Sequence, residues 1–579
     1  MLAPLTTPRS PSKPAPVDLV PSLQPPSVPA WRKMAATKRA EQASLLPTPF
    51  RLSPSTLSNL PDDVRGVPAV CGLLSARQLE ITEVDEASTL LERLREGAYS
   101  AVEVAEAFCG RAAIAHQLVN CLTEICFESA LKRARELDEH LQRTGKVVGP
   151  LHGLPVSLKD QFCLKGVDST MGFVSLIGKP AAQNSVVVDL LLELGAVLYC
   201  KTNCPQTMMA AETNNNVFGR TLNPRDRKLA AGGSSGGEGA LLAMKGSIVG
   251  VGTDYGGSIR VPSLCNGLYG LRPTTRRLPY AGVANVLKGF EGIESTIGPM
   301  ARSVDSLRVF MDAVVDAEPC LRDSKVIERP WLPSSDASKL HVAYLTDSGL
   351  AHSHPPVRRA IAETVAALRA AGHEVTELPG LDFARAGELF STISAADGGA
   401  DLASFLAGTD EPIIPEAFAA SGPPSPSSVY NLSQTLVRRD AFRQDFLETW
   451  RTSASSSAEN RPFDLILCPL TAHLAWPHLG RPHDSELITW TTTWSLLDVP
   501  CATLPVGELD PVKDAPHPLP EQAYSAFDQQ HWDGYSFERF KNAPLVVQLV
   551  SPRRFREDEL LGMVSEVERA VKAYQAERE

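Results

Sequence analysis

The sequence lacks the features that mark several large classes of protein. It has no run of 18 apolar residues, the length a helix needs to span a bilayer. Its most apolar window, residues 185–200, is interrupted by Asp189 and Glu193. It also has no excess of basic residues, because 56 Lys and Arg stand against 67 Asp and Glu, a formal net charge of −11. The missing apolar run means that we expect no membrane span. Since nucleic-acid-binding surfaces are basic, we also expect no nucleic-acid partner.

Metal-binding and disulfide signatures are absent too. The eleven cysteines are an odd number without regular spacing, and no CxxC pair or Cys/His cluster occurs. We therefore predict no metal site and no cofactor. Unpaired cysteines persist in reducing compartments, so the cysteine content favours a cytoplasmic protein.

The first 30 residues contain nine prolines and no apolar stretch typical of a secretory signal. Such a segment buries too little apolar surface to fold by itself. We expect residues 1–30 to be a disordered, Pro-rich extension, with folding beginning near Trp31. Length alone would allow two to four domains in the whole chain.

Predicted helices and strands alternate along most of the remaining sequence. The expected helices are residues 82–97, 100–119, 129–145, 190–194, 239–246, 356–371 and 557–576. The expected strands are residues 151–160, 196–200, 247–254, 341–347, 373–378, 463–469, 501–507 and 544–551. This alternation predicts an α/β protein with a central sheet covered by helices. Two polar stretches, residues 408–430 and 453–460, are expected to be surface insertions.

Residues 230–263 are unusually rich in glycine, with ten glycines among 34 residues. Glycine inside a helix or strand costs roughly 0.5–1 kcal/mol relative to alanine, so a local requirement is expected. A phosphate-binding loop does not explain it, because no lysine follows at the G-x-x-x-x-G-K-[ST] position. A dinucleotide fingerprint also fails, since Gly250 and Gly252 fit but Tyr255 occupies the third position.

A nucleophile elbow is a second explanation. Residues 233–237 match G-x-S-x-G with Ser235 at the centre, and His473, His478 and His483 lie downstream as candidate bases. The elbow requires a strand directly before it, however, and the preceding segment is polar and typical of a loop. The match is therefore incomplete.

A third explanation uses more of the residues. Ser258 follows a predicted buried strand, and Gly256 and Gly257 allow the backbone N–H groups to converge on an oxyanion. One such donor is worth roughly 2.7–4 kcal/mol. A serine nucleophile needs a base, and Lys159, in an apolar segment, could act as one if burial kept it neutral. Ser234 could then relay a proton between Lys159 and Ser258.

Several motifs carry a family resemblance. They are GPLHGLPVSLKDQF (149–162), KTNCPQTM (201–208), FGRTLNP (218–224), GGSSGGEGALLA (232–243), GVGTDYGGSIRVPSLCNGLYGLRPT (250–274) and STIGPMARSVDSLRVFMDAV (295–314). In this order they resemble the amidase signature family of serine hydrolases, densely over residues 80–315 and more thinly afterwards. The resemblance implies one large α/β domain, residues 31–579, with a mixed central sheet covered by helices.

The resemblance also implies a Ser-cisSer-Lys triad. Ser258 would be the nucleophile, Ser234 the serine that follows a cis peptide bond, and Lys159 the base. The oxyanion hole would be formed by the N–H groups of Tyr255, Gly256, Gly257 and Ser258. The glycines would then shape two loops that carry the serines.

Four further residues have expected supporting roles. Asp254 and Arg260 flank the nucleophile and are expected to form a structural ion pair. Ser235 either hydrogen-bonds the relay or is a simple loop hydroxyl. Met208 resembles a substrate-lining position, with core packing as the alternative.

Within the family, the sequence is most similar to fungal acetamidase-like members, and next to fatty-acid amide hydrolases. The resemblance implies hydrolysis of a small-molecule carboxamide, with a small aliphatic amide such as acetamide favoured. Four alternatives stay open: a fatty-acid amide hydrolase, an aryl amide hydrolase, an amidotransferase subunit that delivers ammonia to a partner, and an inactive binding protein. A homodimer is the oligomer we expect.

Overall fold

The fold was analysed in a computed structural model, which describes residues 28–332, 339–378, 380–415, 425–479, 485–519 and 521–578. The predicted N-terminal extension lies outside the described residues as far as residue 27. Helix α1 (Ala30–Ser44) is the first element, at the place where the sequence predicted that folding begins. None of the helices among these residues has the length and apolar character needed to cross a membrane.

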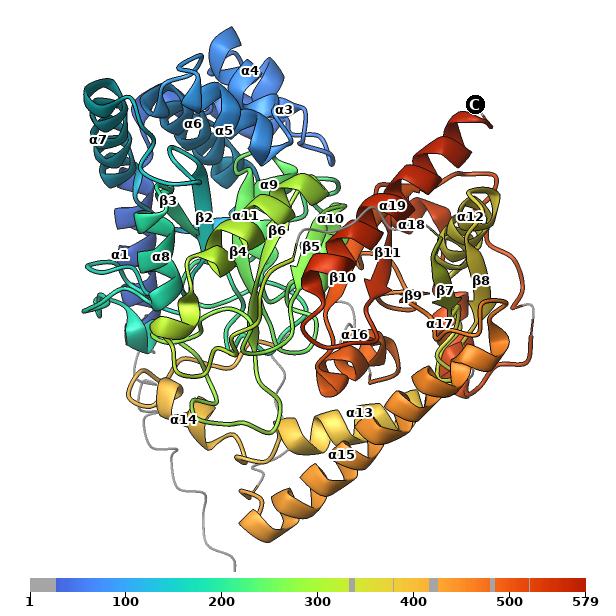
Figure 1. Ribbon diagram of the computed structural model, residues 1–579. Helices are drawn as coiled ribbons and strands as arrows, with labels where there is room; N and C mark the ends of the chain where they lie inside the picture. The colour runs from blue at the N-terminus through green and yellow to red at the C-terminus, as the bar shows by residue number, and fades with distance from the viewer. Residues whose placement is uncertain are drawn as a thin grey trace, which may run out of the picture.

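One mixed sheet of 11 strands organises the described chain, in the order β1-β3-β2-β4-β6-β5-β10-β11-β9-β7-β8 (Figure 1). The strands are β1 Leu122–Ile125, β2 Pro155–Lys159, β3 Val197–Thr202, β4 Val249–Asp254, β5 Tyr269–Arg272, β6 Thr296–Ala301, β7 His341–Tyr344, β8 Glu374–Glu377, β9 Leu465–Cys468, β10 Cys501–Glu508 and β11 Pro544–Val550. β2 runs parallel to β3 and β4, whereas β6, β5, β10, β11 and β9 continue the sheet with antiparallel pairs. β7 is parallel to both β9 and β8. The predicted α/β class with a mixed central sheet is confirmed.

Helices cover both faces of this sheet. They are α1, α2 Pro54–Ser58, α3 Val67–Val70, α4 Ala76–Glu83, α5 Ala87–Arg95, α6 Ala101–Val119, α7 Phe127–Thr144, α8 Val186–Glu193, α9 Gly236–Ala243, α10 Arg260–Asn266, α11 Val304–Asp316, α12 Pro355–Ala370, α13 Phe383–Ser394, α14 Ala400–Leu406, α15 Val429–Thr452, α16 Ser485–Leu497, α17 Ala526–Asp533, α18 Phe537–Phe540 and α19 Glu557–Ala576. Four 3-10 turns are η1 Thr48–Phe50, η2 Val174–Leu176, η3 Pro319–Leu321 and η4 Ser453–Ser456. In Figure 1, α4 to α7 lie together near β3, and α13 runs beside the long α15.

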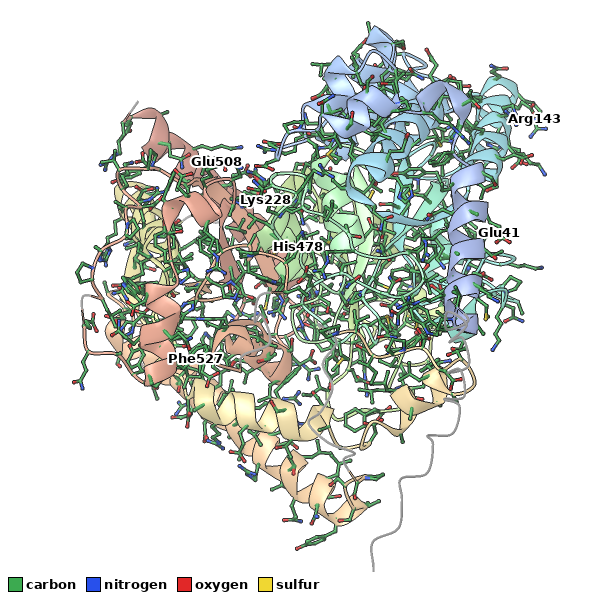
Figure 2. The ribbon with its side chains drawn as sticks, turned by 180° about the vertical axis from the view of Figure 1, so that it is seen from behind. Glu41, Arg143, Lys228, His478, Glu508 and Phe527 are labelled. Atoms are coloured by element: carbon green, nitrogen blue, oxygen red, sulfur yellow. The ribbon has the colours of Figure 1, made fainter. Side chains whose placement is uncertain are left out.

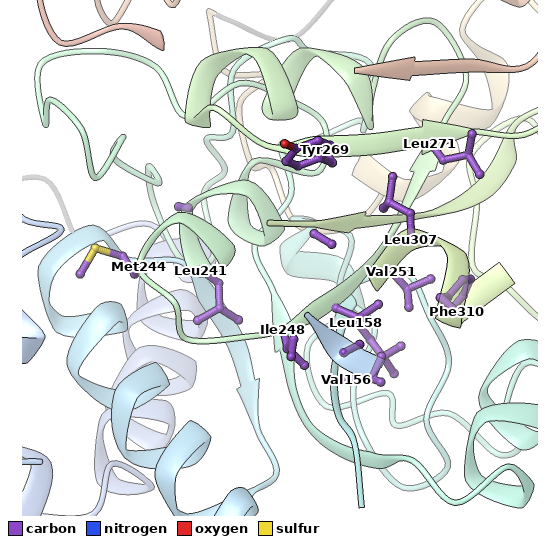
Figure 3. Packing of buried hydrophobic residues seen from close by; sticks show 14 of the residues in the cluster. Val156, Leu158, Leu241, Met244, Ile248, Val251, Tyr269, Leu271, Leu307 and Phe310 are labelled. Carbon is purple, nitrogen blue, oxygen red and sulfur yellow. The ribbon is translucent and has the colours of Figure 1, made fainter. Parts of the chain in front are cut away.

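The apolar side chains of the central strands belong to the main core. Val156 and Leu158 of β2 and Val251 of β4 are fully buried, and Figure 3 shows them close to Leu307 and Phe310 of α11. β2 is buried on both faces, yet Val156 and Leu158 alternate with the polar Ser157 and Lys159 along it. This burial determines the environment of any polar side chain at the ends of these strands.

Capping boxes at Ser100 and at Ser75 determine where two of the N-terminal helices begin, and only the first of these was predicted. The Ser100/Glu103 capping box that begins α6 is present as predicted, with both hydrogen bonds formed. A helix beginning at Thr82 was wrong, because Thr82 lies in the last turn of α4, which a capping box at Ser75 and Gln78 starts earlier. The chain is extended at Val84 before α5 begins, so two helices replace the single predicted one.

The segment expected to be a surface insertion at residues 408–430 is partly internal. Glu411 and Ile414 are buried, and Glu411 accepts hydrogen bonds from Val174 N (2.8 Å) and Gln206 Nε2 (3.1 Å). Residues 416–424 lie outside the described residues. The first part of this segment therefore packs against the loop that carries Met208, instead of standing away from the molecule.

Candidate active site

Lys159 lies at the carboxyl end of β2, between β3 and β4, and its side chain is fully buried. Its Nζ donates hydrogen bonds to Ser234 Oγ at 2.6 Å and to Thr253 Oγ1 at 2.9 Å. Burial in this apolar setting disfavours the charged form and lowers the pKa of Lys159 from 10.5 to about 8. The amine can therefore be neutral near physiological pH.

Ser234 is held in a tight loop before α9. The peptide bond between Gly233 and Ser234 is cis, as the resemblance implies. Gly232 has a φ of +79°, and a Cβ there would lie 2.7 Å from Pro262 Cα. A Cβ on Gly237 would lie 2.3 Å from Asn203 N. The glycines thus let two backbone segments approach closely and bring the Ser234 hydroxyl to Lys159.

Ser258 follows β4 in a second loop, which is joined to the first by the Ser235 N–H donating to Ser258 O at 3.1 Å. Ser234 and Ser258 border the same small cavity, of about 40 Å³. Within the described residues, the Ser258 hydroxyl has no hydrogen-bond partner. The two serines are thus adjacent to one space in which a reacting group could lie.

An ion pair fixes the turn that carries Ser258. Asp254, fully buried, accepts from Arg260 Nε and Nη2, both at 3.0 Å. Burial alone would raise the pKa of Asp254, but the charge and hydrogen bonds of Arg260, together with Arg272 and the Ile259 N–H, outweigh it and lower that pKa to about 2. Arg260 also donates to Gln548 Oε1 (2.9 Å) and Ser495 Oγ (3.0 Å). The turn is therefore anchored to β11 and α16.

The structure corrects one member of the expected oxyanion hole. The N–H of Gly257 donates to Asp254 Oδ1 at 2.7 Å, so it stabilises the turn and does not point toward a substrate. In the part of the chain that is described, the N–H groups of Tyr255, Gly256 and Ser258 donate to no other group. These three remain as candidate donors.

The residues of the nucleophile-elbow alternative are not brought together. Ser235 is fully buried, and its hydroxyl donates to Thr253 O at 3.4 Å, not to the relay. His473 contacts its neighbour's carbonyl, Leu474 O, at 2.6 Å. His478 lies beside Lys228 (Figure 2). The backbone N–H of His478 donates to the backbone carbonyl of Lys228 at 3.2 Å. His483 lies outside the described residues.

Sequence reasoning missed three buried polar residues around Lys159. Thr253, the second partner of the amine, donates in turn to Gln161 Oε1 at 2.7 Å. Glu238, in α9, accepts from Ser157 Oγ at 2.5 Å, and burial raises the pKa of Glu238 to about 8. Thr253, Gln161 and Glu238 all lie inside the quoted motifs. The sequence feature that could have identified them is a polar residue within a glycine-rich or apolar segment.

A larger cavity, of about 150 Å³, also opens at Ser258. Met208, predicted to be substrate-lining, borders both this cavity and the smaller one, and it also packs with Phe173 and Val286 in a small apolar cluster. Met208 thus has core contacts and also borders the cavities, and its role in substrate binding stays a prediction. The arrangement of a buried amine, two serines and two adjoining cavities is suited to acyl transfer.

Comparison with known proteins decides the family. A family model described as amidase matches residues 103–561. The chain belongs to the amidase signature family. It is a hydrolase that acts on amides. Acetamidase of Emericella nidulans is 40% identical over 550 residues, covering 93% of this chain and 98% of that protein. Acetamidase of Aspergillus oryzae is 36% identical over 548 residues, with the same coverage.

Among solved structures, fatty acid amide hydrolase is similar over 94% of this chain and 95% of its own, with a TM-score of 0.85 and 30% sequence identity. A bacterial aryl acylamidase shares the fold, with a TM-score of 0.65 and 20% identity. The amidase fold predicted from the motifs is confirmed by this likeness.

Proposed function

We propose that the protein hydrolyses a carboxamide to a carboxylic acid and ammonia or an amine through an acyl-enzyme on Ser258. Ser234 acts as proton relay and Lys159 as base. The observation that carries the proposal is the 2.6 Å hydrogen bond from Lys159 Nζ to Ser234 Oγ, with a pKa of Lys159 of about 8. A nucleophilic serine needs such a base within hydrogen-bond reach.

In the first half-reaction, neutral Lys159 takes a proton from Ser234 as Ser234 takes the proton of Ser258. Ser258 Oγ then forms a bond with the amide carbon, and the N–H groups of Tyr255, Gly256 and Ser258 stabilise the oxyanion. Ser234 returns a proton to the nitrogen as the C–N bond breaks, and Lys159 reprotonates Ser234. In the second half-reaction, water attacks the acyl-enzyme by the same relay and releases the acid.

Asp254 and Arg260 support this reaction from behind the turn. Their ion pair holds the N–H groups of Gly257 and Ile259, which donate to the carboxylate at 2.7 and 3.2 Å. The donors that face the substrate are thereby fixed before the substrate binds. Preorganised donors of this kind stabilise developing charge without reorganisation.

We propose a small aliphatic amide such as acetamide as the first substrate to test. The support is the 40% identity to an acetamidase along nearly the whole chain. All eleven cysteines are free, which supports the expected cytoplasmic location. The homodimer stays a prediction that sedimentation of the full chain can check.

The test compares wild type with Ser258→Ala, Lys159→Ala and Ser235→Ala. Ammonia release is measured, and covalent labelling by a fluorophosphonate locates the nucleophile. We expect Ser258→Ala to lose both labelling and activity, and Lys159→Ala to lose activity. Ser235→Ala, next to the relay serine, should still be labelled. Labelling that persists in Ser258→Ala and disappears in Ser235→Ala would instead support the nucleophile elbow.

A further inference from the structure

The two cavities at Ser258 differ in size and in what borders them. The smaller, of about 40 Å³, is bordered by Ser234 and Thr253, the partners of Lys159. The larger, of about 150 Å³, is bordered by Gly256 but, among the described residues, not by Ser234 or Lys159. Ser258 borders both. A substrate bonded to Ser258 therefore extends into two unlike spaces.

Proton transfer determines which half of the substrate occupies which space. The leaving nitrogen must accept its proton from Ser234, so it lies on the side where that hydroxyl is exposed, in the smaller cavity. The bonds around the carbonyl carbon then direct the acyl group to the opposite side. The acyl group therefore enters the larger cavity. This assignment rests on the function proposed above.

The larger cavity is built for an uncharged, apolar group. Its walls include Phe390 of α13, Ile488 of α16 and Trp476, and no charged side chain of the described residues borders it. Phe390 lies against the loop of the nucleophile, since a Cβ on Gly256 would lie 2.8 Å from its Cζ. Its ring also contacts that of Tyr255, with centroids 5.4 Å apart. An acyl chain here would contact mostly aromatic and aliphatic surface, with serine and threonine hydroxyl groups forming the rest of the wall.

The volumes set the size of each group. An apolar cavity of about 150 Å³ is large enough for a benzene molecule, whereas a site for one water needs only about 10–15 Å³. The larger cavity of about 150 Å³ thus accepts a phenyl ring or a chain of similar bulk, and an acetyl group would leave most of it unfilled. The smaller cavity of about 40 Å³ accepts ammonia or a very small amine but not an aryl or long alkyl amine.

We propose that the preferred substrates are primary amides of aromatic or medium-length aliphatic acids, with a phenyl-sized acyl group, and that the product nitrogen leaves as ammonia. Each methylene that enters the apolar cavity should raise kcat/KM about fourfold, from its transfer free energy. Hexanamide and benzamide should therefore exceed acetamide by about two orders of magnitude.

The test measures kcat/KM for acetamide, butyramide, hexanamide and benzamide, and for the anilide of acetic acid. Equal or higher kcat/KM for acetamide than for hexanamide and benzamide would overturn the inference while leaving amide hydrolysis established. A faster anilide would overturn the assignment of the two sides. Failure of the proposed function would look different, because no amide would be hydrolysed and Ser258 would not be labelled.

A cavity-filling variant tests the location of the acyl group. Thr492 borders the larger cavity from α16, and Thr492→Phe should lower the ratio of kcat/KM for hexanamide or benzamide to kcat/KM for acetamide at least tenfold. Thr492→Val is the matched variant of similar volume, and it should keep the wild-type preference if the fold is intact. Ser433→Phe, on exposed α15, adds the same ring away from the site. An unchanged preference in a folded Thr492→Phe variant would overturn the assignment.

Discussion

The charge state of Lys159 should control the rate of the enzyme as the pH changes. Only the neutral amine can take the proton of Ser234, so kcat/KM should follow the neutral fraction of Lys159. With a pKa of about 8, about one tenth of the enzyme is active at pH 7 and about one hundredth at pH 6. The rate should therefore rise about tenfold between pH 6 and 7 and level off above pH 9.

The same lowered pKa has a consequence for stability. The folded pKa lies below the value in the unfolded chain, so between pH 8 and 10.5 the unfolded state binds more protons, and stability rises with pH across this window. Below pH 8 the buried amine is charged in the folded protein. The free energy of unfolding is then lower than at high pH by about 3 kcal/mol for this shift of the pKa, which is the cost of charging the amine. Lys159→Met removes that cost and loses two hydrogen bonds, each worth about 1 kcal/mol.

The Lys159→Met variant should therefore be inactive yet about 1 kcal/mol more stable than wild type at pH 7, and less stable above pH 10.5. The assay is ammonia release from pH 5 to 10, together with urea unfolding at pH 7 and at pH 10.5. Lys201 offers a control, since it is also fully buried but donates to Asp168 O (2.6 Å) and Ser169 Oγ (2.7 Å) and lies 3.7 Å from Asp160 Oδ1, with no hydrogen bond to Ser234 or Ser258 among the described residues. Lys201→Met should leave the midpoint of the fall of kcat/KM at low pH unchanged.

Three results would refute this reasoning. The first is a fall of kcat/KM at low pH, here called the acid limb, whose midpoint lies below pH 6 in wild type. It would mean that the pKa of Lys159 does not control the rate or that another group is the base. Activity retained by Lys159→Met would remove the lysine from the reaction altogether. Stability that falls for Lys159→Met at pH 7 by the full value of the lost hydrogen bonds would show that the buried amine carries no charging cost.

Two other buried groups give further predictions. Glu238→Gln should leave the acid limb of kcat/KM close to its wild-type position, because Glu238, with a pKa of about 8, is mostly uncharged over that limb; a limb that moves by a full pH unit would contradict this. Asp254→Asn should lower stability by about 3–5 kcal/mol, since it leaves Arg260 buried without a counter-charge. The pKa of Asp254 is lowered from 3.8 to about 2, so this difference should be complete above about pH 4 and fade toward pH 2 in urea unfolding. Equal stability of the two proteins at pH 7 would contradict the role of the ion pair.

Local sequence patterns predicted much of the fold. Helix α19 has the predicted bounds, and the α6 capping box is read directly from Ser100 and Glu103, because both signals involve residues within one turn of each other. The break between α4 and α5 was missed, since an acidic stretch compatible with a helix start was taken for one. The inward packing of Glu411 was also missed, because its partner Gln206 lies 205 residues away.

The sequence by itself determined the family and the three residues of the proposed relay, since their motifs are continuous and occur in a fixed order. Only the tertiary structure decided how they meet. Lys159 and Ser234 are 75 residues apart, and their contact depends on the pairing of β2 with β4 and on glycines that admit close backbone approach. The lowered pKa of Lys159 and the unequal cavities arise from side chains packed around the site by distant helices. These depend on the global arrangement of the chain, which no local pattern encodes.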